Sequence, residues 1–150
     1  MANFPLKVAI GSDHAGLVLR AVVKKKLQAG GVEVHDLGPE GPASVDYPDY
    51  AAKVCKEVAS GRAELGVLVC GTGIGMSIAA NKAKGIRAAL CRSEFEARMA
   101  RAHNFANVLC LGERVTGAGL AEAIVAAFLE SSFEGGRHER RVAMLKALDG

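Results

Sequence analysis

The amino-acid sequence predicts an α/β fold in which a five-stranded parallel sheet is covered by helices on both faces. Short β-rich runs alternate with helical patterns along the chain, and this alternation is typical of βαβ units. The run LGVLV at 65–69 is a buried strand that leads straight into glycines and then a helix. Glycine makes up 18 of the 150 residues, more than the usual ~7%, which suits a fold with many short strand-to-helix turns.

The N-terminal half supplies three strands, each followed by a helix. We expect these strands at 7–11, 32–37 and 65–69. The first helix spans 17–29 and is closed by Gly30 and Gly31. A loop with two prolines and two glycines follows at 38–47, and Pro48 suits the first turn of the second helix, which runs to about residue 60. The third helix begins after the glycine-rich turn.

The C-terminal half supplies the remaining two strands and three more helices. The strands are expected at 86–91 and 108–111. Ser93 and Glu96 have capping-box spacing and open a helix that ends near 103–104. A helix at about 120–130 places Leu120, Ile124 and Phe128 on one stripe. After the tail at 135–141, a last short helix reaches about residue 148.

Composition limits the classes of protein that this chain can be. At 150 residues we expect one domain, 1–150. The net charge of +3 is small and aromatic residues are scarce, so no nucleic-acid partner is expected. The four cysteines (55, 70, 91 and 110) form no C-x-x-C pair and predict no zinc or redox motif. The start of the sequence has no secretory pattern and no stretch approaches ~18 apolar residues, so we expect a cytoplasmic protein with no membrane partner.

The turn after the central strand is the clearest candidate site. Cys70 stands at the strand's carboxyl end, and glycines at 71, 73 and 75 open the following helix. N–H groups at a helix start attract anions and favour a thiolate over a thiol. The spacing G-x-G-x-G is not the dinucleotide fingerprint, and the lysine of a P-loop is absent. A tight turn with a buried cysteine at its corner would be the structural alternative.

Other polar residues join this candidate site by topology. In a parallel sheet the ligand lies at the carboxyl ends of the strands, which places Asp13, His14, Cys70 and the turn after Cys91 on one edge. Asp13 also fits a helix N-cap, so a purely structural role is the alternative.

Two further groups of polar residues are candidates. His103 and Asn104 lie at a helix end, where both suit the helix terminus. Arg137 and Arg141 are four apart and would align on one side of a helix to bind phosphate or carboxylate, or form only a solvated face. The cysteines other than Cys70 are expected in the core.

The sequence closely resembles the ribose-5-phosphate isomerase B family, which also takes in allose- and galactose-6-phosphate isomerases. The resemblance covers nearly the whole chain and is carried by several motifs in the same order. These are GSDHAG at 11–16, DYPDYA at 46–51, CGTGIGMSIAANK at 70–82, GIRAAL at 85–90, RAHNFANVLCLGERV at 101–115 and EGGRHERRV at 134–142.

The resemblance implies a Rossmann-like three-layer αβα sandwich with a C-terminal helical tail. It also implies an aldose–ketose isomerase that uses no cofactor and no metal, and that interconverts ribose 5-phosphate and ribulose 5-phosphate in the pentose phosphate pathway. The family works as a homodimer or homotetramer with active sites at the subunit interface. One branch of the family has serine at the cysteine position and a glutamate base in the loop; with Cys70, and with Met76 after Gly75, this chain belongs to the cysteine-base branch.

Residue roles follow from the resemblance in the same way. Cys70 is the expected base, His103 the ring-opening acid with Asp13 assisting, and Thr72 orients the reacting end. The expected substrate-binding residues are Asp13, His14, Gly71, Thr72, Gly73, Ile74, Gly75, Asn104, Arg114, Arg137 and Arg141. The partner chain is expected to donate His103, Asn104 and Arg114. Tyr47 lies in one of the motifs and is expected to line the site without a catalytic role.

Two alternative functions stay open at this point. A six-carbon sugar phosphate, allose 6-phosphate or galactose 6-phosphate, would use the same catalytic groups, because one more carbon changes the depth of the pocket. A non-catalytic phosphosugar-binding module would keep the fold and the phosphate contacts, but it gives no reason for a cysteine and two histidines around the glycine turn.

Overall fold

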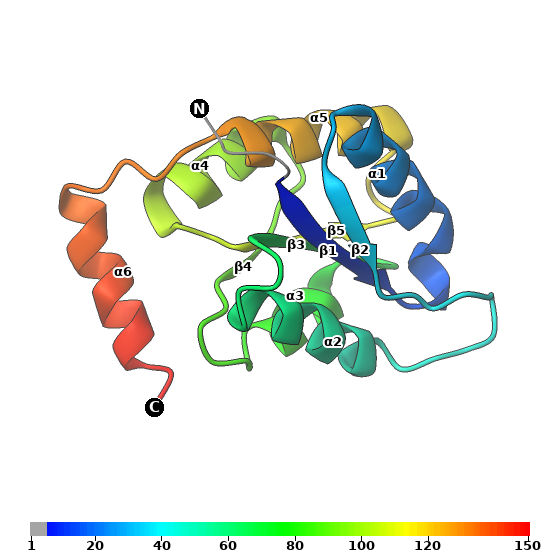
Figure 1. Ribbon diagram of the computed structural model, residues 1–150, viewed down its shortest axis with the longest axis horizontal. Coiled ribbons are helices and arrows are strands. Elements are labelled where there is room, and N and C mark those ends of the chain that lie inside the picture. The colour runs from blue at the N-terminus through cyan, green and yellow to red at the C-terminus, as the bar shows by residue number, and fades with distance from the viewer. Residues whose placement is uncertain (1–5) are drawn as a thin grey trace.

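The structure, a computed structural model, describes residues 6–150 and confirms the predicted fold class (Figure 1). The expectations about the N-terminal sequence and the domain start fall in part on residues 1–5, which lie outside the described range. Five parallel strands form one sheet in the order β2-β1-β3-β5-β4. They are β1 (Lys7–Ser12), β2 (Glu33–Asp36), β3 (Leu65–Cys70), β4 (Ala88–Leu90) and β5 (Val108–Gly112).

Helices cover both faces of the sheet. The helices are α1 (Leu17–Ala29), α2 (Tyr47–Ala59), α3 (Ile74–Ala80), α4 (Glu94–Asn104), α5 (Ala118–Glu130) and α6 (Arg137–Ala147), with a 3-10 turn, η1, at His14–Gly16. Buried residues of α1, α4 and α5 share one apolar core with the sheet, and those of α2 and α3 share the other. The helix α6 extends along the side of the molecule beside α4 (Figure 1).

The alternation of side chains along β3 explains why the core is double. Val67 and Val69 contribute to the core under α1, α4 and α5, whereas Leu68 and Cys70 contribute to the core under α2 and α3. Because successive side chains of a strand point to opposite faces, an apolar run is required wherever both faces are covered. Cys70 therefore faces the α2–α3 layer as the last residue of its strand.

Most element boundaries agree with the sequence prediction, and the differences have local causes. The second strand is shorter than expected because the Val32 N–H donates to the Leu27 carbonyl (3.1 Å) and belongs to the end of α1. The fourth strand is also shorter, since the Ile86 N–H closes a turn onto Ala83 (3.2 Å).

The stripe predicted for the fifth helix is partly wrong. Ile124 and Phe128 are buried, but Leu120 is 44% exposed. The buried face instead includes Ala121 and Val125, because positions 121, 124, 125 and 128 follow the helical period toward the sheet.

The order of the strands reverses direction at β1, and in open α/β sheets a ligand usually lies at the carboxyl ends of the strands at such a point. The chain adds β2 on one side of β1 and β3 on the other. The Asp13 N–H donates to the Val69 carbonyl (3.2 Å), so the turn after β1 packs directly on the end of β3. A Cβ added at Gly16 would lie 2.6 Å from the same carbonyl oxygen, which explains the glycine. Over residues 6–150, every helix is too short or too polar to cross a membrane.

Candidate active site

Cys70 lies at the corner between β3 and the glycine-rich turn. Its side chain is 5% exposed, and its Sγ accepts a hydrogen bond from the Gly73 N–H (3.2 Å). Gly73 has φ of +82°, a conformation that favours glycine, and a Cβ there would meet Leu90 at 2.6 Å. The next N–H, that of Ile74, donates to Oγ1 of Thr72 (3.2 Å). The backbone of the turn therefore folds back, so that the Gly73 N–H faces the sulfur of Cys70.

The loop after β5 packs against the glycine-rich turn and forms hydrogen bonds with it. The Glu113 N–H donates to the Cys70 carbonyl and the Arg114 N–H to the Gly71 carbonyl, both at 2.9 Å. Gly112 packs against the backbone of Thr72 so closely that a Cβ would lie 2.7 Å from the Thr72 Cα. The guanidinium of Arg114 lies beside Gly71 of its own chain: a Cβ at Gly71 would be 3.4 Å from Nη1. Two turns that are 40 residues apart in the sequence therefore form one surface.

Asp13 and His14 complete this surface from the β1 side. Asp13 is buried, and its Oδ1 accepts the Ala15 N–H (2.9 Å), so it caps the 3-10 turn as the structural alternative predicts. His14 is exposed, and its Nδ1 accepts the Val45 N–H (3.2 Å). With Nδ1 used as an acceptor, the proton of the neutral ring is on Nε2, which can donate to a ligand.

Tyr47 also belongs to this side of the site. Its ring packs on Gly75, where a Cβ would come within 2.7 Å of ring carbons. The side chain is 39% exposed, at the start of α2. Tyr47 therefore lies beside the glycine-rich turn.

His103 and Asn104 lie at the other edge of the sheet. They end α4, four residues before β5 begins, whereas Cys70 pairs with Gly112 at the far end of β5. The five residues of β5 separate the two groups by about 16 Å, at roughly 3.3 Å per residue. A single chain does not bring His103 to Cys70.

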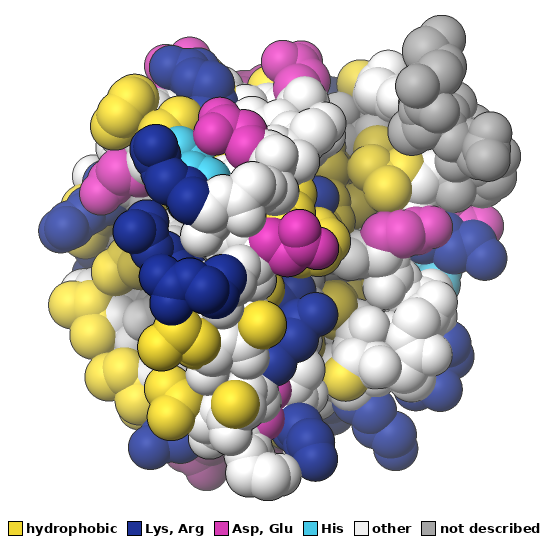
Figure 2. Space-filling view, turned by 90° about the vertical axis from the view of Figure 1, so that its left-hand side faces the viewer, with side chains coloured by type: hydrophobic (Ala, Val, Ile, Leu, Met, Phe, Trp, Pro, Cys, Tyr) yellow, Lys and Arg dark blue, Asp and Glu magenta, His cyan; other side chains and the backbone are white. Residues whose placement is uncertain are grey.

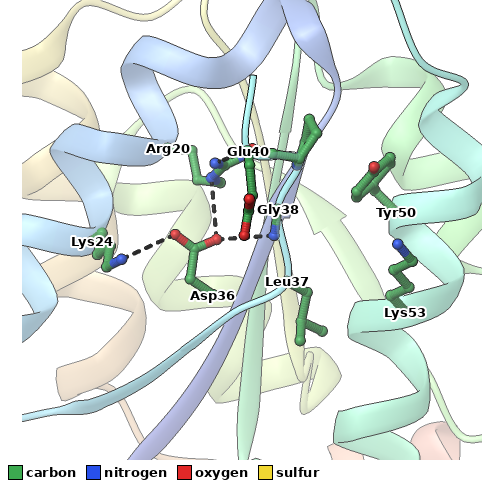
Figure 3. Close-up of a pocket in the computed structure, with 9 residues that line it drawn as sticks. Arg20, Lys24, Asp36, Leu37, Gly38, Glu40, Tyr50 and Lys53 are labelled. Carbon is green, nitrogen blue, oxygen red and sulfur yellow. Dashed lines mark hydrogen bonds and ion pairs between the residues drawn. The ribbon is translucent and has the colours of Figure 1, made fainter. Parts of the chain in front are cut away.

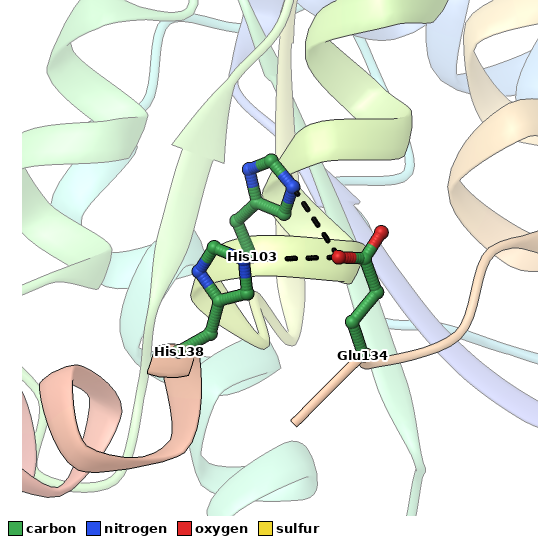
Figure 4. A group of neighbouring side chains, drawn as sticks. All are labelled: His103, Glu134 and His138. Atoms are coloured by element: carbon green, nitrogen blue, oxygen red, sulfur yellow. Dashed lines mark ion pairs between the residues drawn. The ribbon is translucent and has the colours of Figure 1, made fainter. Parts of the chain in front are cut away.

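Arg137 and Arg141 lie in the first turns of α6, and both are exposed. Figure 2 shows the α6 side of the molecule, where Lys and Arg side chains gather beside hydrophobic ones. The large exposed apolar residues of this helix are Met144 and Leu145, and Leu148 caps its C-terminus. His103 itself stacks on His138 of α6, with ring centroids 4.1 Å apart and planes at 11° (Figure 4). Sequence reasoning did not assign His138 to the site.

The other three cysteines are core residues, as expected. Burial raises the pKa of Cys55 to about 11, and burial together with the charge of Glu96 raises the pKa of Cys91 to about 12. Cys110 is fully buried, and burial raises its pKa well above the ordinary value. All three thiols stay protonated near neutral pH, so none of them is a candidate base.

A hollow in the molecule is a separate feature from this surface. It has a volume of about 600 Å³ and lies where β2 ends, between α1 and α2 (Figure 3). Arg20 on its wall is fully occupied: it donates to Ser12 Oγ (2.6 Å) and the Pro39 carbonyl (2.5 Å), and pairs with Asp36 (3.3 Å). The hollow contains none of the predicted site residues. Its polar groups hold the ends of β1 and β2 and the following loop together.

Comparison with known proteins places the chain among sugar phosphate isomerases. A family model described as "Ribose/Galactose Isomerase" matches residues 8–145. A putative sugar phosphate isomerase of Bacillus subtilis is 49% identical over 141 residues, 93% of this chain and 95% of that protein. Ribose-5-phosphate isomerase B of Escherichia coli is 46% identical over 143 residues, 95% of this chain and 96% of that protein.

Solved structures agree with this placement. That of Clostridium thermocellum ribose-5-phosphate isomerase B is similar with a TM-score of 0.95 and 49% identity, covering 96% of this chain and 97% of that one. That of a Thermotoga maritima ribose 5-phosphate isomerase has a TM-score of 0.94 and 52% identity, and the match covers 96% of this chain and 99% of that one.

Proposed function

The chain belongs to the ribose/galactose isomerase family, and from this membership we propose that it interconverts ribose 5-phosphate and ribulose 5-phosphate, a step of the pentose phosphate pathway. The observation that carries the proposal is the placement of Cys70 at the carboxyl end of β3, with its sulfur under the glycine-rich turn and Asp13 and His14 on the neighbouring turn.

The reaction moves one proton between two carbons. In the open-chain aldose, the Cys70 thiolate removes the proton from C2, and the electron pair of that C–H bond passes toward the C1 carbonyl to give an enediolate. The proton of the C2 hydroxyl passes to O1, the thiol returns its own proton to C1, and the carbonyl forms at C2. The Gly73 N–H that points at Sγ supports negative charge on the sulfur before the proton is taken.

The enediolate needs donors that are already in place. Backbone N–H groups aimed at a developing oxyanion need little reorganisation, and one such donor contributes roughly 3–4 kcal/mol in other enzymes. Two N–H groups of the turn are used internally, those of Gly73 and Ile74. We therefore assign the oxyanion contacts to the N–H groups of Gly71, Thr72 and Gly75, with the Thr72 hydroxyl orienting the reacting end.

The substrate is mostly cyclic in solution, so an acid must open the ring. We assign this step to His103, with Asp13 assisting near the ring oxygen, because imidazole both donates and accepts protons near neutral pH. Since His103 and Asn104 lie at the opposite edge of the sheet, we propose that a second copy of the chain supplies them and that the active site lies between the two copies. Asn104 would then hydrogen-bond the sugar.

The phosphate end supplies binding energy away from the reacting carbons. We assign it to His14 and Arg114 from the carboxyl edge and to Arg137 and Arg141 from α6, whose guanidinium groups suit phosphate oxygens. In one chain His14 and Arg114 are exposed, as are the two α6 arginines. Docking of a second copy through the apolar side chains of α6 would bring the two sets together.

The experiment that tests this function is a steady-state assay of the purified full chain with ribose 5-phosphate and with allose 6-phosphate, after removal of metal ions with a chelator. We expect turnover of ribose 5-phosphate and a lower kcat/KM for allose 6-phosphate. Turnover of the six-carbon sugar alone would keep the chemistry and change the substrate. Binding of ribose 5-phosphate without turnover of either sugar would refute the isomerase proposal.

Sharing of the site predicts recovery of activity in a mixed oligomer. Cys70→Ala and His103→Ala are each expected to be nearly inactive alone. Mixed after dissociation, they should regain about a quarter of wild-type activity, because half of randomly paired dimers are mixed and each mixed dimer holds one intact site of two. Refolded single variants are the control. Activity that stays at the level of the single variants would contradict a shared site.

A further inference from the structure

Three side chains from three separate segments meet beside the end of α4. They are His103, Glu134 in the connection between α5 and α6, and His138 in the first turn of α6 (Figure 4). The Oε1 atom of Glu134 lies 3.6 Å from Nε2 of His103 and 3.7 Å from Nε2 of His138. Both imidazoles thus direct the same ring nitrogen at one carboxylate.

The backbone holds this arrangement in place. The Glu134 N–H donates to the Ala102 carbonyl in α4 (3.0 Å), and the His138 N–H donates to the Gly135 carbonyl (3.0 Å). His138 is buried, and its ring stacks on that of His103. The Glu134 side chain is 57% exposed, so it can turn toward a ligand without disturbing the core.

We propose that His103, Glu134 and His138 form a binding site for a divalent cation of the zinc class, and that a bound cation inhibits the enzyme. Two imidazoles and one carboxylate, with a fourth position left for water, are a donor set that zinc uses in proteins. The imidazoles favour zinc, copper or nickel over calcium and magnesium, which prefer oxygen ligands.

The spacing of the ligand atoms is close to what a metal requires. All three lie within 4.8 Å of one another. Around a tetrahedral zinc, with bonds of about 2.0–2.2 Å, ligand atoms are about 3.3–3.6 Å apart. Because the two rings stack with their planes at 11°, their Nε2 lone pairs are nearly parallel. Both rings would have to rotate out of the stack, with Glu134 turning inward, for the three atoms to reach one cation. Arg137 and Arg141 lie within three residues of His138 on α6, so their positive charge opposes a cation and the carboxylate of Glu134 offsets it.

The inhibitory part of the inference rests on the proposed function, whereas the binding part does not. A cation on Nε2 of His103 occupies the lone pair through which the ring exchanges its proton, so the ring-opening step stops. It also holds α6 to α4, which restricts the side chains of Arg137 and Arg141.

Titration with zinc chloride alone tests the binding part. Wild-type protein, freed of metal with a chelator, is expected to bind one zinc per chain in isothermal titration calorimetry. Cobalt is expected to give the visible absorbance of a tetrahedral site. Glu134→Gln and His138→Phe each remove one ligand, and the phenyl ring keeps the stacking on His103. Each variant should lose at least the 10–100-fold in affinity that the loss of an outer-shell partner costs.

Two controls identify the ligands. His35→Gln removes a histidine that also lies beside a carboxylate, Glu33 at 2.8 Å, and it should bind zinc as the wild type does. Cys70→Ser removes the one thiol that is proposed to ionise, and it too should bind zinc unchanged. The absence of saturable binding to the wild type, unchanged affinity in both ligand variants, or loss of binding only in Cys70→Ser would overturn the site. Unchanged turnover of ribose 5-phosphate in saturating zinc would overturn the proposed inhibition. This part of the test requires isomerase activity, which the steady-state assay described above measures independently.

Discussion

Replacing Cys70 with alanine is expected to lower kcat for ribose 5-phosphate by roughly 10²–10⁴-fold, the range that a positioned proton-transfer group contributes. The variant keeps the turn and its N–H groups but has no group at that place to take the proton from C2. KM should change little, since the phosphate contacts are made by other residues. Initial rates and circular dichroism on the same samples measure the effect and show that the fold is retained.

Cys55→Ala is the matched control for this variant. Cys55 is also buried on the α2–α3 side of the sheet, but burial keeps its thiol protonated. Its replacement should leave kcat near the wild-type value and change only stability. An equal loss of kcat in both variants would indicate a packing effect. Turnover of Cys70→Ala within tenfold of wild type would mean that another group is the base.

Replacing Gly112 with alanine is expected to reduce kcat/KM by about 100-fold or more, because a displacement of about 1 Å in a positioned group has that effect. The added methyl group would overlap the backbone of Thr72, including its carbonyl oxygen at 2.5 Å. Backbone cannot turn aside as a flexible side chain does, so the turn that carries Thr72 and Gly73 must move. Overpacking of this kind also costs roughly 1–3 kcal/mol in the free energy of unfolding.

Gly119→Ala is the matched control. Gly119 lies in the first turn of α5, and a Cβ there meets nothing within 4 Å. Alanine is a better helix former than glycine by roughly 0.8–1.0 kcal/mol, so this variant should be slightly more stable and fully active. Urea unfolding and steady-state rates compare the two variants. Wild-type activity in Gly112→Ala would show that the turn tolerates displacement.

Local pattern determined most of the fold. The β-rich runs located all five strands. Helix ends were located by the glycines after the first helix, by Pro48 in the first turn of α2 and by the Ser93–Glu96 capping box. All of these signals act over a few residues. The hydrogen bond from the Glu96 N–H to Ser93 Oγ (3.1 Å) is the one that the spacing predicts. The errors are at strand ends and on the face of α5, where packing against the sheet determines which residues are paired or buried.

The sequence also indicated the carboxyl-edge half of the site. Asp13, Cys70 and the following turn are there because parallel strands end at one edge, a rule that needs no side-chain contacts. The assignment of catalytic roles to these residues depended on the family resemblance, and so did the assignments for Asn104 and Arg114. For Arg137 and Arg141, the spacing of four residues already suggested a phosphate or carboxylate site.

The sequence by itself determined the elements, their parallel arrangement and the turn that holds Cys70, because these follow from periodicity and turn chemistry over a few residues. Only the tertiary structure decided that Gly112 lies under Thr72, that His103 is a strand's length from Cys70, and that His103, Glu134 and His138 meet. The physical reason is that Gly112 and Thr72, His103 and Cys70, and His103 and its two neighbours are 31 to 40 positions apart. The order of strands in the sheet and the path of α6 determine whether such residues meet. Neither of these leaves a signal in the local pattern of the chain.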